Sequence, residues 1–210
     1  MKGLLLKDFY MIAKYCRSYL LILAFFLLAS VFSDDNFFFI FYPCVLAGLI
    51  PITLLSYDER SRWNQYFGTL PYTKAQFVSV KYLISLLIVP VPLVFTAVSQ
   101  SIKMYSLGTS DLPGLLLLLG QMLILALFPA ALALPFIFKL GVEKGRLGYF
   151  ITIAVICASA FIMPEFAKSG VLQALRISPG LLFVLILAAS LVFYTASWQL
   201  SIRFYEKREI

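Results

Sequence analysis

Six long runs without Asp, Glu, Lys or Arg divide the chain and restrict what it can fold into. They contain 16, 22, 21, 27, 18 and 26 residues. A helix needs about 20 apolar residues to cross the roughly 30 Å hydrocarbon core of a bilayer. Charged residues make up only 13% of the 210 residues, against about 25% in a typical soluble domain. The sequence therefore predicts a membrane protein.

We expect one all-α transmembrane domain over residues 1–210. The predicted transmembrane helices lie at about 18–33, 36–57, 80–102, 112–138, 147–164 and 177–202. The first run is short, but its helix can extend back to Arg17 and Lys14, because long basic side chains reach from the apolar region to the interface.

The distribution of basic residues predicts the orientation of these helices. With the N-terminus in the cytoplasm, the cytoplasmic segments hold 14 Lys and Arg residues and the external segments hold 3. Cytoplasmic segments of membrane proteins carry an excess of Lys and Arg. We therefore expect six spans with both termini cytoplasmic. A cleaved signal peptide at the first run is the weaker alternative, since its removal would leave five spans.

Several classes of function are disfavoured by residues that the chain lacks. There is no histidine, and the three cysteines form no CxxC pair, so we expect no metal ligands. No charged residue lies well within a run, although such residues usually mark ion paths and proton relays. These features argue against an ion-coupled carrier and an intramembrane protease. We expect no catalytic residues and no nucleic-acid partner.

Residues 1–17 are too charged to span a bilayer but have a helical pattern. At 100° per residue, Lys2, Lys7, Lys14 and Arg17 fall on one side, and apolar residues lie opposite. Asp8 is the exception, because it lies on the apolar side. The pattern predicts an interfacial helix on the inner leaflet.

The connection at 58–79 is the most informative segment outside the predicted spans. Asp58 is a candidate N-cap for a short helix, and Glu59 suits its first turn. Trp63, Tyr66 and Phe67 are spaced to share one helix face. Flanked by Arg60 and Arg62, this face has the composition of a protein contact. Residence at the membrane interface, where Trp and Tyr are also favoured, is an equal alternative.

The end of this connection contains local stop and start signals. Leu70-Pro71 ends the preceding structure, and Thr73-x-x-Gln76 matches a capping box that begins the next helix. Two other connections are less specific. Residues 139–148 are basic and Gly-rich but lack a phosphate-binding motif, and residues 164–179 favour a short external amphipathic helix.

The polar residues inside the runs are uncharged. Most such groups serve helix packing in membranes. The candidates to line a translocation path are Thr53, Ser85, Gln100, Gln121 and Gln199. Prolines interrupt the third and fourth runs, and neighbours must then satisfy the freed carbonyl groups. We expect kinks at Pro90 and Pro92, and tilt or a break near Pro129 and Pro135.

The whole chain resembles the permease subunit of type-2 ATP-binding-cassette exporters. The resemblance is carried by the order of spans and connecting helices and by two sequence stretches. The first stretch is Met-Lys-Gly-Leu-Leu-Leu-Lys-Asp at 1–8. The second contains Glu59-Arg60, Trp63, Leu70-Pro71 and Lys81-Tyr82, and it looks like the E…W…LP…KY pattern of that group. Within it, the chain is most similar to small Gram-positive permeases that export amphipathic, membrane-active peptides such as phenol-soluble modulins.

The resemblance implies a non-catalytic half-transporter in the bacterial cell membrane. Two copies, or one copy and a sister permease, would form the path. Each copy would dock a separate ATPase that binds ATP and Mg²⁺, whereas this chain would bind no cofactor. The resemblance implies a coupling helix whose ATPase contacts are Asp58, Glu59, Arg60, Arg62, Trp63, Tyr66 and Phe67.

Other functions remain open from the sequence. One alternative is an ATP-independent membrane protein, such as a channel, an immunity factor or a scaffold, because spans without charges suit a passive role equally well. Another is an exporter of drugs or lipids rather than peptides.

Overall fold

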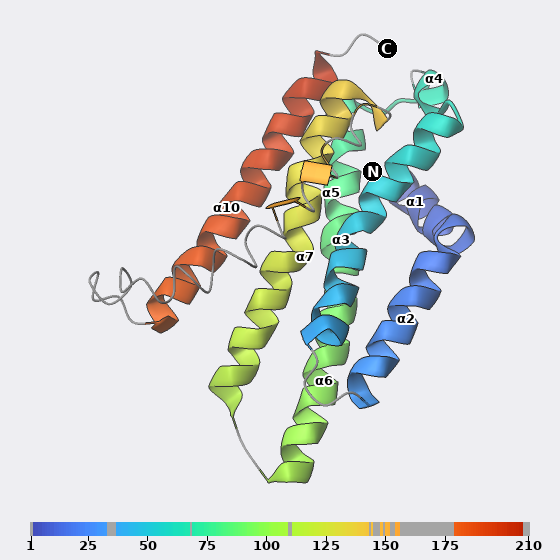
Figure 1. The fold of residues 1–210 in the computed structure, drawn as a ribbon. Helices are drawn as coiled ribbons and strands as arrows, with labels where there is room; N and C mark the ends of the chain where they lie inside the picture. Colours follow the sequence, from blue (N-terminus) through green and yellow to red (C-terminus); the bar gives the residue numbers. More distant parts are fainter. Residues whose placement is uncertain are drawn as a thin grey trace.

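The computed structural model describes residues 2–32, 37–67, 69–108, 111–142 and 179–207, with six single residues between 144 and 155. These residues form helices α1 (Lys2–Tyr15), α2 (Arg17–Phe32), α3 (Phe37–Arg60), α4 (Trp63–Phe67), α5 (Lys74–Ile88), α6 (Pro90–Leu107), α7 (Leu112–Leu140) and α10 (Pro179–Glu206). The long helices run side by side, and α4 lies at the end where α10 finishes (Figure 1).

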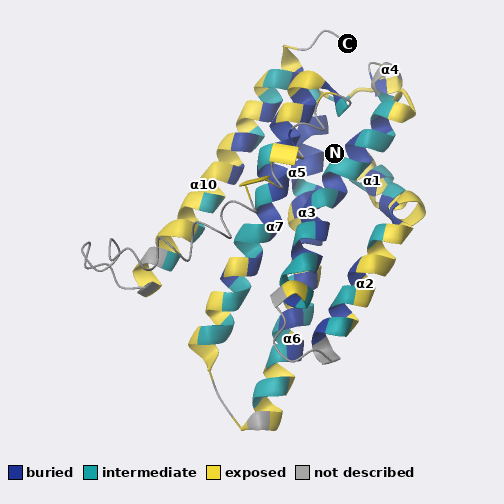
Figure 2. Cartoon of the chain, viewed as in Figure 1, coloured by how far each residue is buried: buried dark blue, intermediate teal, exposed yellow. Residues whose placement is uncertain are grey.

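Helix α7 lies at the centre of the packing. It contacts α3 on one side and α10 on the other, while α2 packs on α3 and α5 packs on α10. Buried positions are concentrated on α3, α5 and α7, whereas much of α10 is exposed (Figure 2). The tightly packed part of the molecule is therefore formed by α3, α5 and α7.

Four described segments are long and apolar enough to cross a membrane. They are Phe38–Arg60, Lys74–Ser106, Leu112–Leu140 and Phe183–Glu206. Helices α1 and α2 pass the same test only as a pair, and they meet at an angle of 74°. The described residues thus hold four candidate spans, or five if the bent pair is one span.

The predicted spans agree with these helices in part. The second, third, fourth and sixth predictions coincide with α3, α5–α6, α7 and α10. The first corresponds to α2, which begins at Arg17 and does not continue back to Lys14, because the chain turns at Cys16. Most of the predicted fifth span, 147–164, lies outside the described residues. The external helix predicted at 164–179 also lies outside them, except for residue 179.

The start of α5 confirms the predicted capping box. The Thr73 hydroxyl accepts from the Gln76 backbone N–H, and the Gln76 side chain accepts from the Thr73 backbone N–H, both at 3.2 Å. These bonds satisfy two amide groups that a helix start leaves without partners. Helices α5 and α6 meet at Val89, immediately before Pro90, and together they form one candidate span. The kinks expected at Pro90 and Pro92 stay a prediction.

Of the tilt or break predicted for the fourth span, the break does not occur, and the tilt stays a prediction. Helix α7 is continuous for 29 residues with Pro129 and Pro135 inside it. Pro135 has no N–H, so the Ala131 carbonyl loses its usual helical donor. The Ser197 hydroxyl of α10 donates to that carbonyl at 2.5 Å. A neighbouring helix thus supplies the bond that the proline removes.

The bond from Ser197 begins a chain of hydroxyl groups that joins α10 to α5. Because Ser197 donates to Ala131, its oxygen accepts from the Tyr82 hydroxyl at 2.8 Å. The Tyr82 oxygen then accepts from Ser201 at 2.7 Å. Tyr194 donates to the Tyr82 backbone carbonyl at 2.8 Å. Three side chains of α10 therefore bond to Tyr82 of α5: Tyr194, Ser197 and Ser201.

Replacing Ser197 with Ala should lower the free energy of unfolding by about 0.6 kcal/mol, with an upper limit of about 1.7 kcal/mol, the range measured for hydrogen bonds between membrane helices. Denaturant unfolding in detergent measures this loss. Ser190→Ala is the matched control, because Ser190 donates only to Leu187 of its own helix. Equal losses for the two variants would contradict the role of Ser197 in replacing the missing helical bond.

Gly48 allows α3 and α7 to approach closely. A Cβ atom at this position would lie 2.3 Å from the backbone oxygen of Ala126 and 3.3 Å from Pro129. A backbone oxygen cannot move aside as the end of a flexible side chain can. The contact between the two central helices therefore requires glycine here.

Gly48→Ala should destabilise the protein by about 1–3 kcal/mol, the usual cost of overpacking a filled interior. The midpoint of thermal unfolding in detergent measures this change. Gly180→Ala serves as the control, since among the described residues no other helix or neighbouring side chain lies within 4 Å of the added Cβ at the start of α10. An unchanged midpoint for Gly48→Ala would show that the two helices do not pack as described.

Candidate functional site

Helix α4 is joined to α3 by a sharp turn. Helix α3 ends at Arg60, and the Arg62 backbone N–H donates to the Glu59 carbonyl at 3.1 Å. Arg62 has a φ of 53°, in the left-handed region that non-glycine residues rarely adopt. This conformation turns the chain, and the five residues of α4 lie at the end of the bundle where α10 finishes (Figure 1).

The side chains of this segment divide between an outer and an inner surface. Arg60, Arg62 and Tyr66 are exposed, with Tyr66 64% exposed. Phe67 is 4% exposed, and its ring centroid lies 5.0 Å from that of Phe77 on α5. Trp63 is half-buried, with the Lys7 ammonium 4.0 Å from its ring centroid.

The three aromatic residues predicted to share one face, Trp63, Tyr66 and Phe67, are therefore divided between two surfaces. Trp63 and Phe67 do lie on the same side of α4, but that side packs on the rest of the molecule. A short helix has no interior of its own, so its largest apolar groups are buried against neighbouring elements, here including Lys7 of α1 and Phe77 of α5. The exposed surface consists of Tyr66 and the two arginines.

The predicted role of Asp58 as an N-cap is wrong. Asp58 lies within α3, two residues before that helix ends at Arg60, and its side chain is buried. Instead of capping α4, its carboxylate forms ion pairs with two lysines. One is Lys7 at 2.6 Å and the other is Lys81 at 2.6 Å.

These contacts belong to a closed ring of four charges, which we call the ion ring: Lys7, Asp8, Asp58 and Lys81. Lys81 pairs with Asp8 at 2.6 Å, and Lys7 completes the ring with Asp8 at 3.4 Å. Positive and negative groups alternate around the ring, and the net charge is zero. Each carboxylate therefore has two cations beside it.

The ion ring joins three helices that are distant in the sequence. Lys7 and Asp8 lie on α1, Asp58 lies on α3 and Lys81 lies on α5. Lys81 is 0% exposed, and the Lys7 side chain is 20% exposed. Burial of isolated charges is costly, but close pairing in both directions offsets that cost. Since Lys7 also covers Trp63, the ring holds α4 in place through α1.

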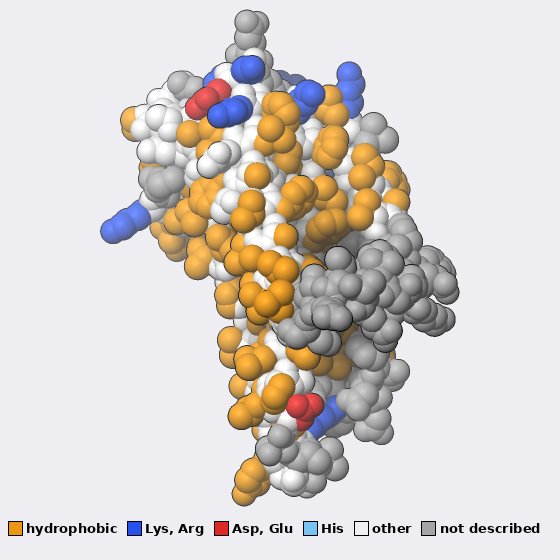
Figure 3. All heavy atoms as spheres, turned by 90° about the vertical axis from the view of Figure 1, so that its left-hand side faces the viewer, with side chains coloured by type: hydrophobic (Ala, Val, Ile, Leu, Met, Phe, Trp, Pro, Cys, Tyr) orange, Lys and Arg blue, Asp and Glu red, His pale blue; other side chains and the backbone are white. Residues whose placement is uncertain are grey.

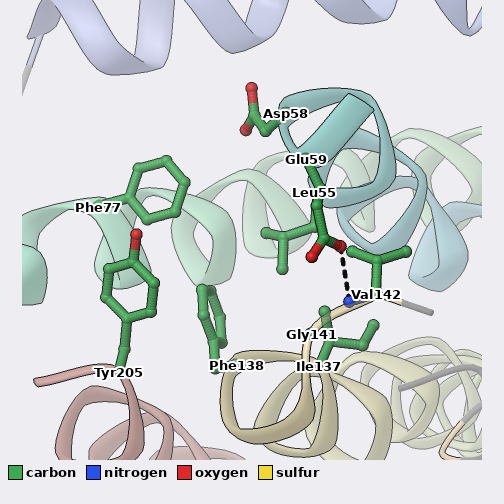
Figure 4. Close-up of a pocket in the computed structure, with 9 residues that line it drawn as sticks. All are labelled: Leu55, Asp58, Glu59, Phe77, Ile137, Phe138, Gly141, Val142 and Tyr205. Carbon is green, nitrogen blue, oxygen red and sulfur yellow. Dashed lines mark hydrogen bonds between the residues drawn. The ribbon is translucent and has the colours of Figure 1, made fainter. Parts of the chain in front are cut away.

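Glu59 connects the same end of α3 to α7. Its carboxylate accepts from the Val142 backbone N–H at 2.7 Å, just after Gly141 ends α7 with a φ of 83°. Figure 4 shows Glu59 pointing towards Val142 and Asp58 pointing in another direction. Adjacent residues of α3 thus bind different parts of the molecule.

The remaining predicted positions do not share one environment. Ser85 is buried, Gln100 is half-buried, and Gln121 and Gln199 are exposed. The Thr53 hydroxyl donates to the Leu49 carbonyl of its own helix at 3.2 Å. Their assignment to a translocation path stays a prediction. In the part of the chain that the structure describes, no three His, Cys, Asp or Glu residues are grouped as metal ligands would be.

A family model described as "ABC-2 family transporter protein" matches residues 3–206, nearly the whole chain. The protein belongs to the ABC-2 transporter family. Comparison with curated proteins and with solved structures yields no match. Membership agrees with the apolar helices of a multi-pass membrane protein, and it indicates a permease subunit that works with an ABC ATPase.

Sequence reasoning missed the ion ring in this ABC-2 protein. One signal was present, because Asp8 lies on the otherwise apolar side of the N-terminal helix. A carboxylate on a buried face needs a cation. The partner could not be chosen from the sequence, since Lys81 lies 73 residues away and Lys7 and Asp58 are 51 residues apart.

Lys81→Met should destabilise the protein by about 3–5 kcal/mol, because it leaves two buried carboxylates with only the partly exposed Lys7 between them. Lys7→Met should cost less, since Lys7 is closer to solvent. Denaturant unfolding in detergent gives both values.

A second variant separates charge from packing. Asp8→Leu combined with Lys81→Met removes one cation and one anion, and it leaves the 2.6 Å pair of Lys7 and Asp58. We expect the double variant to be more stable than Lys81→Met alone. A double variant as unstable as the single one would mean that packing, rather than charge balance, sets the loss.

Proposed function

We propose that this protein is the membrane-spanning subunit of an ATP-driven exporter and that α4 is its coupling helix. The proposal rests on family membership and on one observation above all, the exposed Arg60, Arg62 and Tyr66 at the tip of the α3–α4 turn. Tyrosine and arginine are enriched at the energetic centres of protein interfaces. A separate ATPase subunit binds ATP and Mg²⁺ in this proposal.

The fixed position of α4 supports a mechanical role. Its inner side packs on Phe77 and Lys7, and the ion ring and the bond between Glu59 and Val142 connect this region with α1, α3, α5 and α7. A force applied to Tyr66 would therefore move several helices together. In the proposed cycle, ATP closes the two ATPases, the coupling helices approach each other, and α3 and α5–α6 tilt to open the path outward.

The proposed orientation places α4 and both termini in the cytoplasm of a bacterial cell, with six spans in the cell membrane. The distribution of 14 and 3 basic residues supports it. Helix α1 has exposed Leu6, Phe9 and Tyr10 on the side away from the ion ring. Such a face suits the membrane interface, where aromatic residues are favoured.

We further propose that two permeases form the path and that its substrates are amphipathic, membrane-active peptides. Exposed apolar side chains extend along α6 and α10, which suits contact with lipid or a second permease. Spans without charged residues suit a substrate that is itself partly apolar. The resemblance to peptide exporters supports this substrate class over drugs and lipids.

The exposed tip of α4 provides the test. Tyr66→Ala combined with Arg62→Asn should weaken co-purification with the ATPase by about 30-fold or more, since truncation of interface centres costs about 2 kcal/mol or more. Asparagine is chosen because it tolerates the left-handed backbone of Arg62. The measurement is the yield of ATPase after tagged purification from native membranes in mild detergent.

Two variants serve as controls for this test. Tyr10→Ala removes a tyrosine that is 69% exposed on α1, and Arg62→Lys keeps the charge at the turn. Both should retain the ATPase. If wild-type protein elutes without an ATPase in several detergents, or if the double variant keeps its ATPase, α4 is not the coupling helix.

A further inference from the structure

A groove with an apolar wall runs between α7 and α10, near the end of the bundle that carries α4. Its volume is about 410 Å³, within the roughly 300–1,000 Å³ range of small-molecule sites. Its wall is formed mainly by apolar side chains: Leu132, Pro135, Phe136, Phe193, Leu200 and Phe204. Ser197 also borders the groove, but its hydroxyl is already donated to the Ala131 carbonyl. The wall thus offers hydrocarbon contacts and little hydrogen bonding.

The groove opens to the outside of the bundle rather than into its interior. Phe136, Phe193 and Leu200 are exposed. The view from the left-hand side of Figure 1, where α10 lies, shows hydrophobic side chains over much of the described surface, with most Lys and Arg near its upper end (Figure 3). In a membrane, the exposed side chains of Phe136, Phe193 and Leu200 can therefore contact lipid.

Lys139 is the charged residue among those that line the groove. It lies in the last turn of α7, and its ammonium is 5.0 Å from the centroid of the Phe204 ring on α10. The two lysines of the ion ring have carboxylate partners. Among the described residues, Lys139 has none within ion-pair distance. An anion that enters the groove would meet this ammonium.

We propose that the groove binds an anionic phospholipid, with the lipid phosphate at Lys139 and an acyl chain along the wall formed by Phe193 and Leu200. The two parts of the site match the two parts of such a lipid. Lys139 and Phe204 lie in the last turns of α7 and α10, where the bundle meets the headgroup region, and the apolar wall continues from there towards the bilayer centre. A cation beside an apolar groove attracts a negative lipid headgroup.

The proposal does not depend on the ATPase or on the transported substrate. Only the name of the leaflet depends on the proposed orientation, which makes it the cytoplasmic leaflet. Loss of lipid binding and loss of ATPase binding are thus measured separately. Tyr66→Ala with Arg62→Asn should leave lipid retention unchanged, because neither residue borders the groove.

Native mass spectrometry of the full chain provides the test. The protein is purified in mild detergent and incubated with equal amounts of dioleoylphosphatidylglycerol and dioleoylphosphatidylcholine. We expect wild-type protein to retain the anionic lipid preferentially. Lys139→Gln should reduce that preference about fivefold, the effect of about 1 kcal/mol per basic residue near a lipid headgroup.

Matched variants distinguish this groove from general attraction to basic surfaces. Lys14→Gln removes an exposed lysine that also lies over an aromatic ring, with its ammonium 5.3 Å from Tyr15, but outside the groove. It should leave the preference unchanged. Ala196→Phe fills the groove from an exposed position and should reduce retention of both lipids.

Three outcomes would overturn the proposal. Equal retention of the two lipids by wild-type protein would mean that the groove holds ordinary boundary lipid. An equal effect of Lys14→Gln and Lys139→Gln would mean non-specific attraction. The third outcome is that the protein loses bound lipid when it dimerises and that Ala196→Phe prevents this dimer. This result would assign the groove to a second copy of the chain.

Discussion

The ion ring is the constraint on which the arrangement of this end of the molecule depends. Buried charges are stable only when opposite charges lie close in a fixed geometry. Asp8, Asp58 and Lys81 satisfy this condition only when α1, α3 and α5 meet at one point. A shift of any of these helices would leave a charge without its partner. The ring therefore selects one arrangement of three helices whose apolar surfaces alone would allow several.

Polar contacts away from the ion ring also determine which helices lie next to each other. Pro135 removes a backbone bond from α7, and Ser197 of α10 replaces it. Tyr82 forms hydrogen bonds with three side chains of α10. In lipid, apolar surface gives little preference for one helix neighbour over another, so hydrogen bonds and close contacts choose the partner. Gly48 supplies such a close contact between α3 and α7.

The position of α4 shows how packing changes the interpretation of a sequence pattern. The spacing of Trp63 and Phe67 correctly indicates a shared helix face, but the pattern cannot say whether that face points outward. Phe77 and Lys7 cover it from α5 and α1. The surface left for a partner is polar and basic, with Tyr66 at its centre. An interface of this kind suits reversible contact with a soluble protein better than an apolar one.

The sequence by itself determined the class of the protein. Runs without charges require a membrane as solvent, the capping box of Thr73 and Gln76 locates the start of α5, and the prolines mark where backbone bonds are missing. These features depend on neighbouring residues, so they can be recognised without the fold. Only the tertiary structure decided that Asp58 is buried rather than a cap, that Phe67 faces inward and that Lys81 pairs with Asp8. Partners separated by 73 residues interact only after the helices between them have packed, and no local pattern specifies that packing.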